Sequence, residues 1–272
     1  MELARLAMAT GDVASLLDQH FLVDESVAEL LTDIAEVSKR DTVLEVGAGL
    51  GIITSRLARV AGRVYAVEKD GRLIPHLMKM AASYPNVEVL HGDFTRLRLP
   101  PFSKVVANPP FQIVEHLLNR VLLLNQAPMT LILPAHLAHR LADPNRSLLS
   151  FKMGLAYTVE VVRPLDPDAF NPPTKRRTAV TMLRHRRKSW AAELLIDVFR
   201  QGDKKVRNAL RDSLARHTSK RIATRMVELS LLAETILNKR VAMISLAEAQ
   251  AIGEVARQHF YPRPATQQLW PR

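Results

Sequence analysis

Short apolar runs alternate with longer amphipathic segments along the first two thirds of the chain. Residues 42–46, 63–68, 87–90 and 104–107 are valine-rich runs of strand length. Apolar residues recur at helical spacing over 27–35, 52–60, 73–83 and 114–124, the first of these after a candidate N-cap, Asp24. Strands that alternate with helices predict right-handed crossovers and a parallel sheet.

The pattern changes towards the end of the chain. Residues 129–133 predict another strand, and 157–163 and 178–183 predict two more that we expect to form an antiparallel edge. Beyond the basic run 184–188 the pattern is helical, with helices expected over 191–199, 204–216, 222–237 and 246–260. Ser245 and Glu248 form a capping box for the last one. We therefore expect an α/β, Rossmann-like catalytic domain over residues 1–185 and a small all-helical domain over 186–272.

Charge is distributed unevenly between these two parts. The 272 residues carry 38 Lys and Arg against 27 Asp and Glu, a net charge of +11. Residues 1–180 hold 20 basic and 19 acidic side chains, whereas residues 181–272 hold 18 and 8. A near-neutral front joined to a basic rear indicates docking on a polyanion, with nucleic acid the first candidate and an anionic membrane the second.

Composition removes several classes of function. The chain has no cysteine, which excludes disulfides, thiolate metal sites and cysteine nucleophiles. No stretch approaches the length of a membrane span, and the first ten residues lack the layout of a signal peptide. We expect a soluble, cytoplasmic protein without membrane contacts, and nothing in the pattern demands more than a monomer.

Candidate chemistry begins where the first predicted strand of the sheet ends. Glycines 47, 49 and 51 form a GxGxG turn that runs into a helix, where backbone N–H groups can approach a ligand. Glu68 ends the next strand, 21 residues after Gly47, and can accept hydrogen bonds from the hydroxyls of a ribose. A dinucleotide and S-adenosylmethionine both fit this arrangement, while the absence of the Walker lysine motif argues against an NTPase.

The next two turns favour S-adenosylmethionine. Asp93 and Phe94 follow the third strand, where the carboxylate could accept from the amine of the cofactor's adenine and the ring could cover it. Asn108-Pro109-Pro110-Phe111 follows the fourth. If the Asn108 oxygen and the Pro109 carbonyl accept the two N–H groups of a base amine, its lone pair can point at the sulfonium methyl, and catalysis is mainly alignment. Phe111 offers a face on which the base can stack.

With these motifs the chain resembles the KsgA-type ribosomal RNA adenine N6-dimethyltransferases, with the Erm 23S rRNA methyltransferases as close relatives. The resemblance runs from about Asp18 to Tyr261. Its pieces are QHFL (19–22), EVGAGLG (45–51), AVEKD (66–70), GDF (92–94), NPPF (108–111), AFNPPTKRRTAV (169–180) and FRQGDKKVRNAL (199–210). The match in the rear part favours small-subunit over large-subunit rRNA.

The resemblance implies roles for individual residues. Gln19 and Leu22 would flank the methionine end of S-adenosylmethionine, Glu45, Gly47 and Gly49 would line it, Glu68 would hold the ribose and Asp93 the adenine. Asn108 would orient the target amine, and Phe111 and Phe170 would stack on either side of the target adenine. Flipped or single-stranded adenines are then the expected substrate. The family modifies two adjacent adenines near the 3′ end of small-subunit rRNA during assembly, so a particle of the pre-30S type is the expected partner.

Departures from the family pattern leave alternatives open. The family's catalytic motif reads NLPY or NIPY, whereas this chain has NPPF, which leaves open whether each adenine receives one methyl group or two. An Erm-like enzyme acting on large-subunit rRNA is one alternative. An assembly or transcription factor that binds nucleic acid without turnover is another.

The basic rear part offers candidate RNA contacts. Lys204, Lys205, Arg207 and Arg211 recur at the spacing of one helix face, and we expect them to contact phosphates. Aromatic residues are scarce there, so the expected task of the rear is to position the RNA and that of the front pocket is to choose the base. His136 and His139 lack a third ligand, and we expect no metal site.

Overall fold

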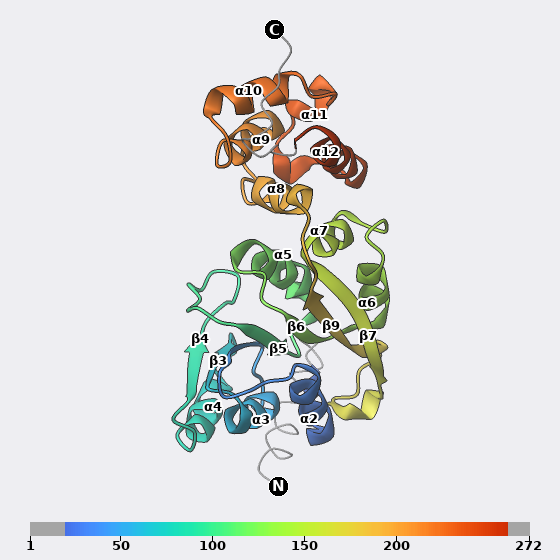
Figure 1. Cartoon of the computed structure of the whole chain (residues 1–272). Coiled ribbons are helices and arrows are strands. Elements are labelled where there is room, and N and C mark those ends of the chain that lie inside the picture. Colours follow the sequence, from blue (N-terminus) through green and yellow to red (C-terminus); the bar gives the residue numbers. More distant parts are fainter. Residues whose placement is uncertain (1–19, 261–272) are drawn as a thin grey trace.

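The computed structural model describes residues 20–260 (Figure 1). Gln19, the first expected cofactor contact, lies outside this range. None of the helices within it is long and apolar enough to cross a membrane.

A seven-stranded sheet of order β4-β3-β2-β5-β6-β9-β7 organises the front part of the chain. Its strands are β2 (Thr42–Val46), β3 (Arg63–Glu68), β4 (Val87–His91), β5 (Lys104–Ala107), β6 (Met129–Pro134), β7 (Tyr157–Leu165) and β9 (Thr178–His185). Pairing is parallel from β4 through β6, and β9 is antiparallel to both β6 and β7. The expected α/β fold with an antiparallel edge is confirmed.

Helices cover both faces of the sheet, as Figure 1 shows. They are α2 (Glu25–Ile34), α3 (Ile52–Val60), α4 (Ile74–Ala81), α5 (Val114–Leu124), α6 (Ala135–Ala142) and α7 (Leu148–Ala156). Successive strand residues point to opposite faces, so Val43 packs in the cluster that holds α2 and α3, while its neighbour Leu44 packs in the cluster that holds α5. Asp24 caps α2 as expected, its side chain accepting from the N–H of Ser26.

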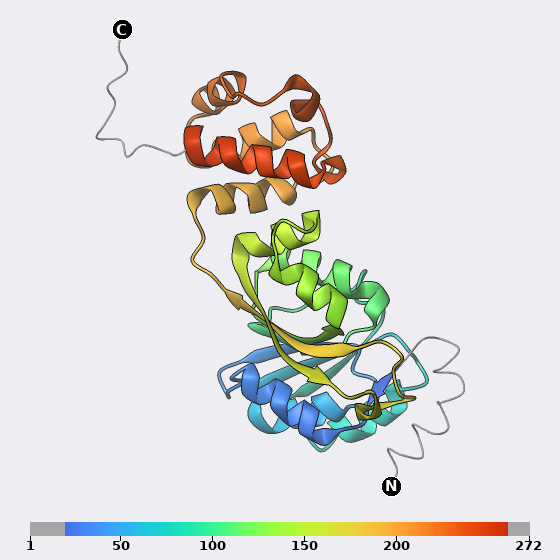
Figure 2. The ribbon, with the colours of Figure 1, turned by 90° about the vertical axis from the view of Figure 1, so that its right-hand side faces the viewer.

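The rear part is helical and has its own buried cluster. It comprises α8 (Trp190–Phe199), α9 (Val206–Leu214), α10 (Lys220–Glu228), α11 (Glu234–Leu237) and α12 (Leu246–His259). Figure 2 shows it beyond the end of the sheet domain where α7 lies, and Leu123 and Phe151 of the front part pack against its cluster. The prediction of a continuous helix over 222–237 is wrong, because α10 ends at Glu228 and Leu232 is buried in the irregular segment before α11.

A second, two-stranded sheet joins the beginning of the described chain to the segment before β9. β1 (Phe21–Leu22) pairs antiparallel with β8 (Phe170–Asn171), with Leu22 opposite Phe170. The N–H of Val23 also donates to the Ala169 carbonyl at 2.9 Å. This pairing fixes Phe21 and Leu22 beside the ends of the main strands.

Candidate active site

A cavity of about 540 Å³ opens at the carboxyl ends of β2, β3, β4 and β5. The chain turns from β2 towards β3 and β4 on one side of the sheet, while β5 and β6 lie on the other, so the cavity sits where the strand order reverses. Open α/β sheets bind ligands at this position. The lining includes most of the residues expected from the sequence, namely Leu22, Glu45, Gly47, Gly49, Glu68, Asp93, Phe94, Asn108, Pro109 and Phe111.

The glycine turn after β2 is in direct contact with the turn after β5. Gly47 has a φ of +81°, and a Cβ placed on it would lie 2.8 Å from Cδ of Pro110. Both the positive φ and this close approach require glycine. The N–H groups of Gly47 and Ala48 donate to the Val67 carbonyl at 2.9 and 3.0 Å, which ties the turn to β3.

Glu68 binds three backbone N–H groups at the end of β3. Its Oε2 accepts from Gly49 at 2.8 Å, and its Oε1 accepts from Lys69 and Asp70, each at 2.8 Å. The side chain is 7% exposed and borders the cavity. One carboxylate therefore holds the glycine turn in place and leaves acceptor capacity for a ligand, since two oxygens offer about four lone-pair sites.

Asp93 is held in its charged form beside the same cavity. Its Oδ1 accepts from the Thr95 N–H and hydroxyl at 2.9 and 2.7 Å, and its Oδ2 accepts from Lys69 Nζ at 2.9 Å. The Lys69 and Thr95 hydrogen bonds hold the pKa of Asp93 far below its usual range. Phe94 is almost entirely buried, its ring is perpendicular to that of His116, and the Arg120 guanidinium lies 4.9 Å from the ring centre.

Glu45 is the most deeply buried acid of the site, at 1% exposure. Burial raises its pKa from about 4.5 to about 8, and the negative charge of Glu68 adds to the effect, while a 2.6 Å hydrogen bond from the Thr54 hydroxyl opposes it. A positively charged ligand in the cavity would favour the ionised form of this carboxyl.

The turn after β5 presents an acceptor and an aromatic ring. Asn108 Nδ2 donates to the His20 carbonyl at 3.4 Å, and its Oδ1 has no donor within residues 20–260. Phe111 begins a short 3-10 helix over Phe111–Ile113 and is half-buried. The Arg176 guanidinium lies 5.8 Å from the centre of the Phe111 ring, within cation–π distance.

Phe170 lies differently from Phe111. Its ring is 2% exposed and packs in the cluster of α2, α3 and one face of the sheet. It is not among the residues that line the cavity. In this structure its surroundings are those of a core residue, and the expected stacking on a target base stays a prediction.

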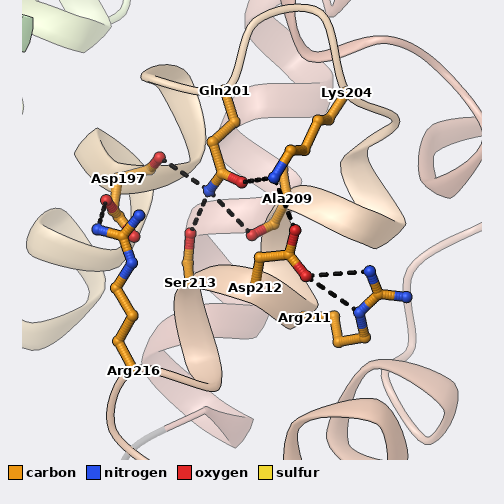
Figure 3. Close-up of polar contacts among 8 residues, drawn as sticks. All are labelled: Asp197, Gln201, Lys204, Ala209, Arg211, Asp212, Ser213 and Arg216. Carbon is orange, nitrogen blue, oxygen red and sulfur yellow. Dashed lines mark hydrogen bonds and ion pairs between the residues drawn. The ribbon is translucent and has the colours of Figure 1, made fainter. Parts of the chain in front are cut away.

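Three of the four basic residues expected to contact RNA are engaged in ion pairs within the rear part. Lys204 Nζ lies 2.7 Å from Asp212 Oδ2, and Arg211 binds the other oxygen of Asp212 at 3.0 Å (Figure 3). Arg207 pairs with Glu234. Lys205 is exposed and has no ion pair with a described residue.

Sequence reasoning missed the partners of the site residues and one basic segment beside them. Thr54 lies outside the quoted motifs and Lys69 lies in AVEKD without an assigned role, so only the fold shows that they reach Glu45 and Asp93. The exposed cations 175–177 follow β8 and bring positive charge to the side of Phe111. They stand in the sequence as a KRR run, which was a usable signal.

The cavity fits S-adenosylmethionine, which carries a cationic sulfonium and an ammonium group. The carboxylates of Glu68 and Asp93 border the space, and so does the Glu45 carboxyl, which a cationic ligand would ionise. Gly47 and Gly49 leave the backbone of the first turn bare, and their positive φ values exclude larger residues without strain. The volume lies in the range of small-molecule sites. Within residues 20–260 no three His, Asp or Glu side chains are grouped as metal ligands would be.

Comparisons of the sequence with a family model and with known proteins agree with each other. A sequence model of the family "Ribosomal RNA adenine dimethylase" matches residues 14–254. A probable ribosomal RNA small subunit methyltransferase A of Thermococcus onnurineus is 37% identical over 188 residues, which cover 68% of this chain and 69% of the relative. A protein of the same name from Pyrococcus abyssi is 32% identical over 249 residues, covering 89% and 91%.

Solved structures agree on the fold. A dimethyladenosine transferase of Plasmodium falciparum superposes with a TM-score of 0.60 at 22% identity, covering 89% of this chain and all of that one. The 23S rRNA methyltransferase ErmE gives the same TM-score at 23% identity, covering 88% and 100%. From the family match and these relatives, the chain belongs to the ribosomal RNA adenine dimethylase family, whose enzymes use S-adenosylmethionine to methylate adenine in rRNA.

Proposed function

We propose that this protein methylates N6 of adenine in small-subunit rRNA, at two adjacent adenines near the 3′ end. The observation that carries the proposal is the meeting of the glycine turn, Glu68 and Asn108 in one cavity at the reversal point of the sheet. The choice of the small subunit is supported by the names of the relatives. We further propose a cytoplasmic monomer that acts on a partly assembled particle of the pre-30S type.

The acidic side of the cavity would hold the cofactor. Glu68 would accept from the ribose hydroxyls and Asp93 from the adenine amine, while Glu45, Gly47, Gly49 and Leu22 would line the methionine part. Phe94 would border the adenine. Bound there, S-adenosylmethionine supplies an electrophilic methyl group on a positively charged sulfur. The carboxylates favour this charge, and burial of the cavity strengthens the attraction.

The turn after β5 would hold the target base. Asn108 Nδ2 donates to the His20 carbonyl, so Asn108 Oδ1 can accept one N–H of the adenine amine. The Pro109 carbonyl would accept the other. Two acceptors on one amine draw its nitrogen towards tetrahedral geometry and aim its lone pair. Phe111 would stack on the base, and Phe170 would cover its other side only after a rearrangement that exposes the ring.

The two parts of the chain would divide the work. We propose that residues 1–185 bind the cofactor and the flipped base, and that residues 186–272 bind the RNA backbone. The net positive charge of the rear part supports this division. Phosphate contacts position a protein on RNA, whereas base contacts in a pocket specify the target.

Asn108→Ala tests the chemistry. Loss of a positioning acceptor should slow methyl transfer by about 100-fold or more, with cofactor and RNA binding kept. The assay is transfer of labelled methyl groups to immature small-subunit particles, with mass spectrometry of the rRNA to identify the modified adenines and the number of methyl groups. Asn145→Ala, a surface change between α6 and α7, is the control. Transfer at the parent rate in Asn108→Ala would refute the mechanism, and methylation confined to large-subunit rRNA would refute the choice of substrate.

A further inference from the structure

Two segments far apart in the sequence meet in the rear part and place two cations opposite each other. Lys205, just before α9, and Arg240, after α11, are partners in an isolated antiparallel bridge. The N–H of Val206 donates to the Lys239 carbonyl and the N–H of Val241 donates to the Lys204 carbonyl, both at 2.9 Å. In this pattern the opposed residues form a non-hydrogen-bonded pair, whose side chains lie closest together and on the same face.

The cations next to this pair are neutralised by acids. Lys204 binds Asp212 at 2.7 Å, as Figure 3 shows, and Lys239 binds Glu248 at 2.8 Å. Each directly precedes a member of the bridge in an extended segment, where the side-chain direction alternates from residue to residue. The chain therefore provides carboxylates for the cations on either side of the pair.

Lys205 and Arg240 themselves have no such partner. Both are exposed, and no carboxylate of residues 20–260 forms an ion pair with either. Like charges directly opposite each other destabilise a strand pair. The backbone hydrogen bonds nevertheless hold the two side chains together, so the repulsion would be relieved by an anion bound between them.

We propose that Lys205 and Arg240 form a phosphate-binding pair for the RNA backbone. The inference rests on the proposed function for the identity of the polyanion, and it replaces the sequence-based set of four residues by a pair of which only one member was expected. A phosphodiester suits the pair because the Arg240 guanidinium can donate two parallel hydrogen bonds while the Lys205 ammonium contributes a point charge.

The decisive experiment compares two double variants that each remove two positive charges from the rear part. Lys205→Gln/Arg240→Gln removes the unpaired cations, and Lys204→Gln/Arg211→Gln removes two that share Asp212. Binding to a 3′-terminal fragment of small-subunit rRNA is measured by fluorescence anisotropy, without cofactor, between about 50 and 200 mM salt. Each lost phosphate contact should reduce the slope of log affinity against log salt by roughly 0.7 to 0.9.

We expect the first double variant to flatten the slope by about one to two and the second to leave it near that of the parent. Lys205→Arg/Arg240→Lys, which keeps both charges, should retain the parent slope. Equal slopes in the two Gln variants would refute the proposed phosphate-binding pair, because the salt dependence would then follow net charge alone. A parent protein that binds the fragment without salt dependence would count against the proposed RNA substrate as well, whereas a steep parent slope unchanged in Lys205→Gln/Arg240→Gln would overturn only the pair. Thermal unfolding checks that the variants are folded. At low salt Lys205→Gln/Arg240→Gln should unfold at no lower a temperature than the parent, because the repulsion between the two cations has been removed.

Discussion

Gly47→Ala is the sharpest test of how the turns after β2 and β5 support each other. A residue with a side chain at a φ of +81° costs about 1–2 kcal/mol relative to glycine. The new Cβ would also lie 2.8 Å from Cδ of Pro110. This atom belongs to the proline ring, which fixes the backbone φ, so it cannot move aside by a side-chain rotation. Overpacking of this kind costs about 1–3 kcal/mol, so we expect a total loss of roughly 2–5 kcal/mol in the free energy of unfolding.

The same clash predicts a specific loss of activity. The turn of residues 108–111 must shift to admit the Cβ, and displacement of a positioning group by about 1 Å can slow a reaction by about 100-fold. Stability is measured by urea unfolding and methyl transfer under single-turnover conditions at saturating cofactor. Gly202→Ala is the control, because its Cβ would meet only Ala242 at 3.8 Å, an ordinary contact.

A double-mutant cycle separates the clash from the backbone strain. Pro110→Ala removes the Cδ that the new methyl group meets, so Gly47→Ala should cost about 1–3 kcal/mol less in that background, while the cost of the positive φ remains. If Gly47→Ala is as stable and active as Gly202→Ala, the two turns do not constrain each other as argued. If the losses of stability from Gly47→Ala and Pro110→Ala are additive, the new methyl group does not clash with Pro110.

Two further predictions concern buried residues of the front part. The raised pKa of Glu45 means that the folded protein binds this proton more tightly than the unfolded chain, so the associated stability is complete below about pH 4.5 and is lost as the pH rises through about 8. Glu45→Gln cannot ionise, and its unfolding free energy without cofactor should therefore fall less than that of the parent between pH 5 and 8, by up to several kcal/mol; parallel pH profiles would refute the burial effect. Phe170→Ala should lower the unfolding free energy by about 3–5 kcal/mol because the ring is a core residue, whereas Phe170→Leu should recover most of it; a Phe170→Ala protein as stable as the parent would show that the ring is not held in the core.

Local features of the fold were predictable because they depend on neighbours in the sequence. The helix expected over 52–60 has those bounds in the structure, since glycines end the strand before it and its apolar spacing is regular. The candidate cofactor residues lie together because parallel strands bring their carboxyl ends to one edge of the sheet. The succession of strands and turns along the chain was therefore enough to predict that these residues lie at one edge of the sheet.

Features that depend on distant pairing were not predictable. Helix α7 escaped detection because it packs between the sheet domain and the rear helices and so lacks a clear polar face. The burial of Phe170 follows from pairing with Leu22, about 150 residues earlier. The ion pairs of the rear part are also set by tertiary contacts, so the sum of charges could not show which cations have an acidic partner.

The arrangement of charge around the cavity explains how one opening could serve two ligands of opposite charge. The carboxylates of Glu68 and Asp93 border the interior together with the carboxyl of Glu45, whereas Arg176, in the exposed basic run 175–177, lies beside Phe111. A cationic cofactor is attracted inwards by the carboxylates. RNA phosphates are repelled by the same carboxylates and attracted by the outer cations, so the backbone stays outside while a neutral base can enter. The electrostatics therefore favour an extruded adenine over a bound phosphate in the part of the cavity that Asn108 lines.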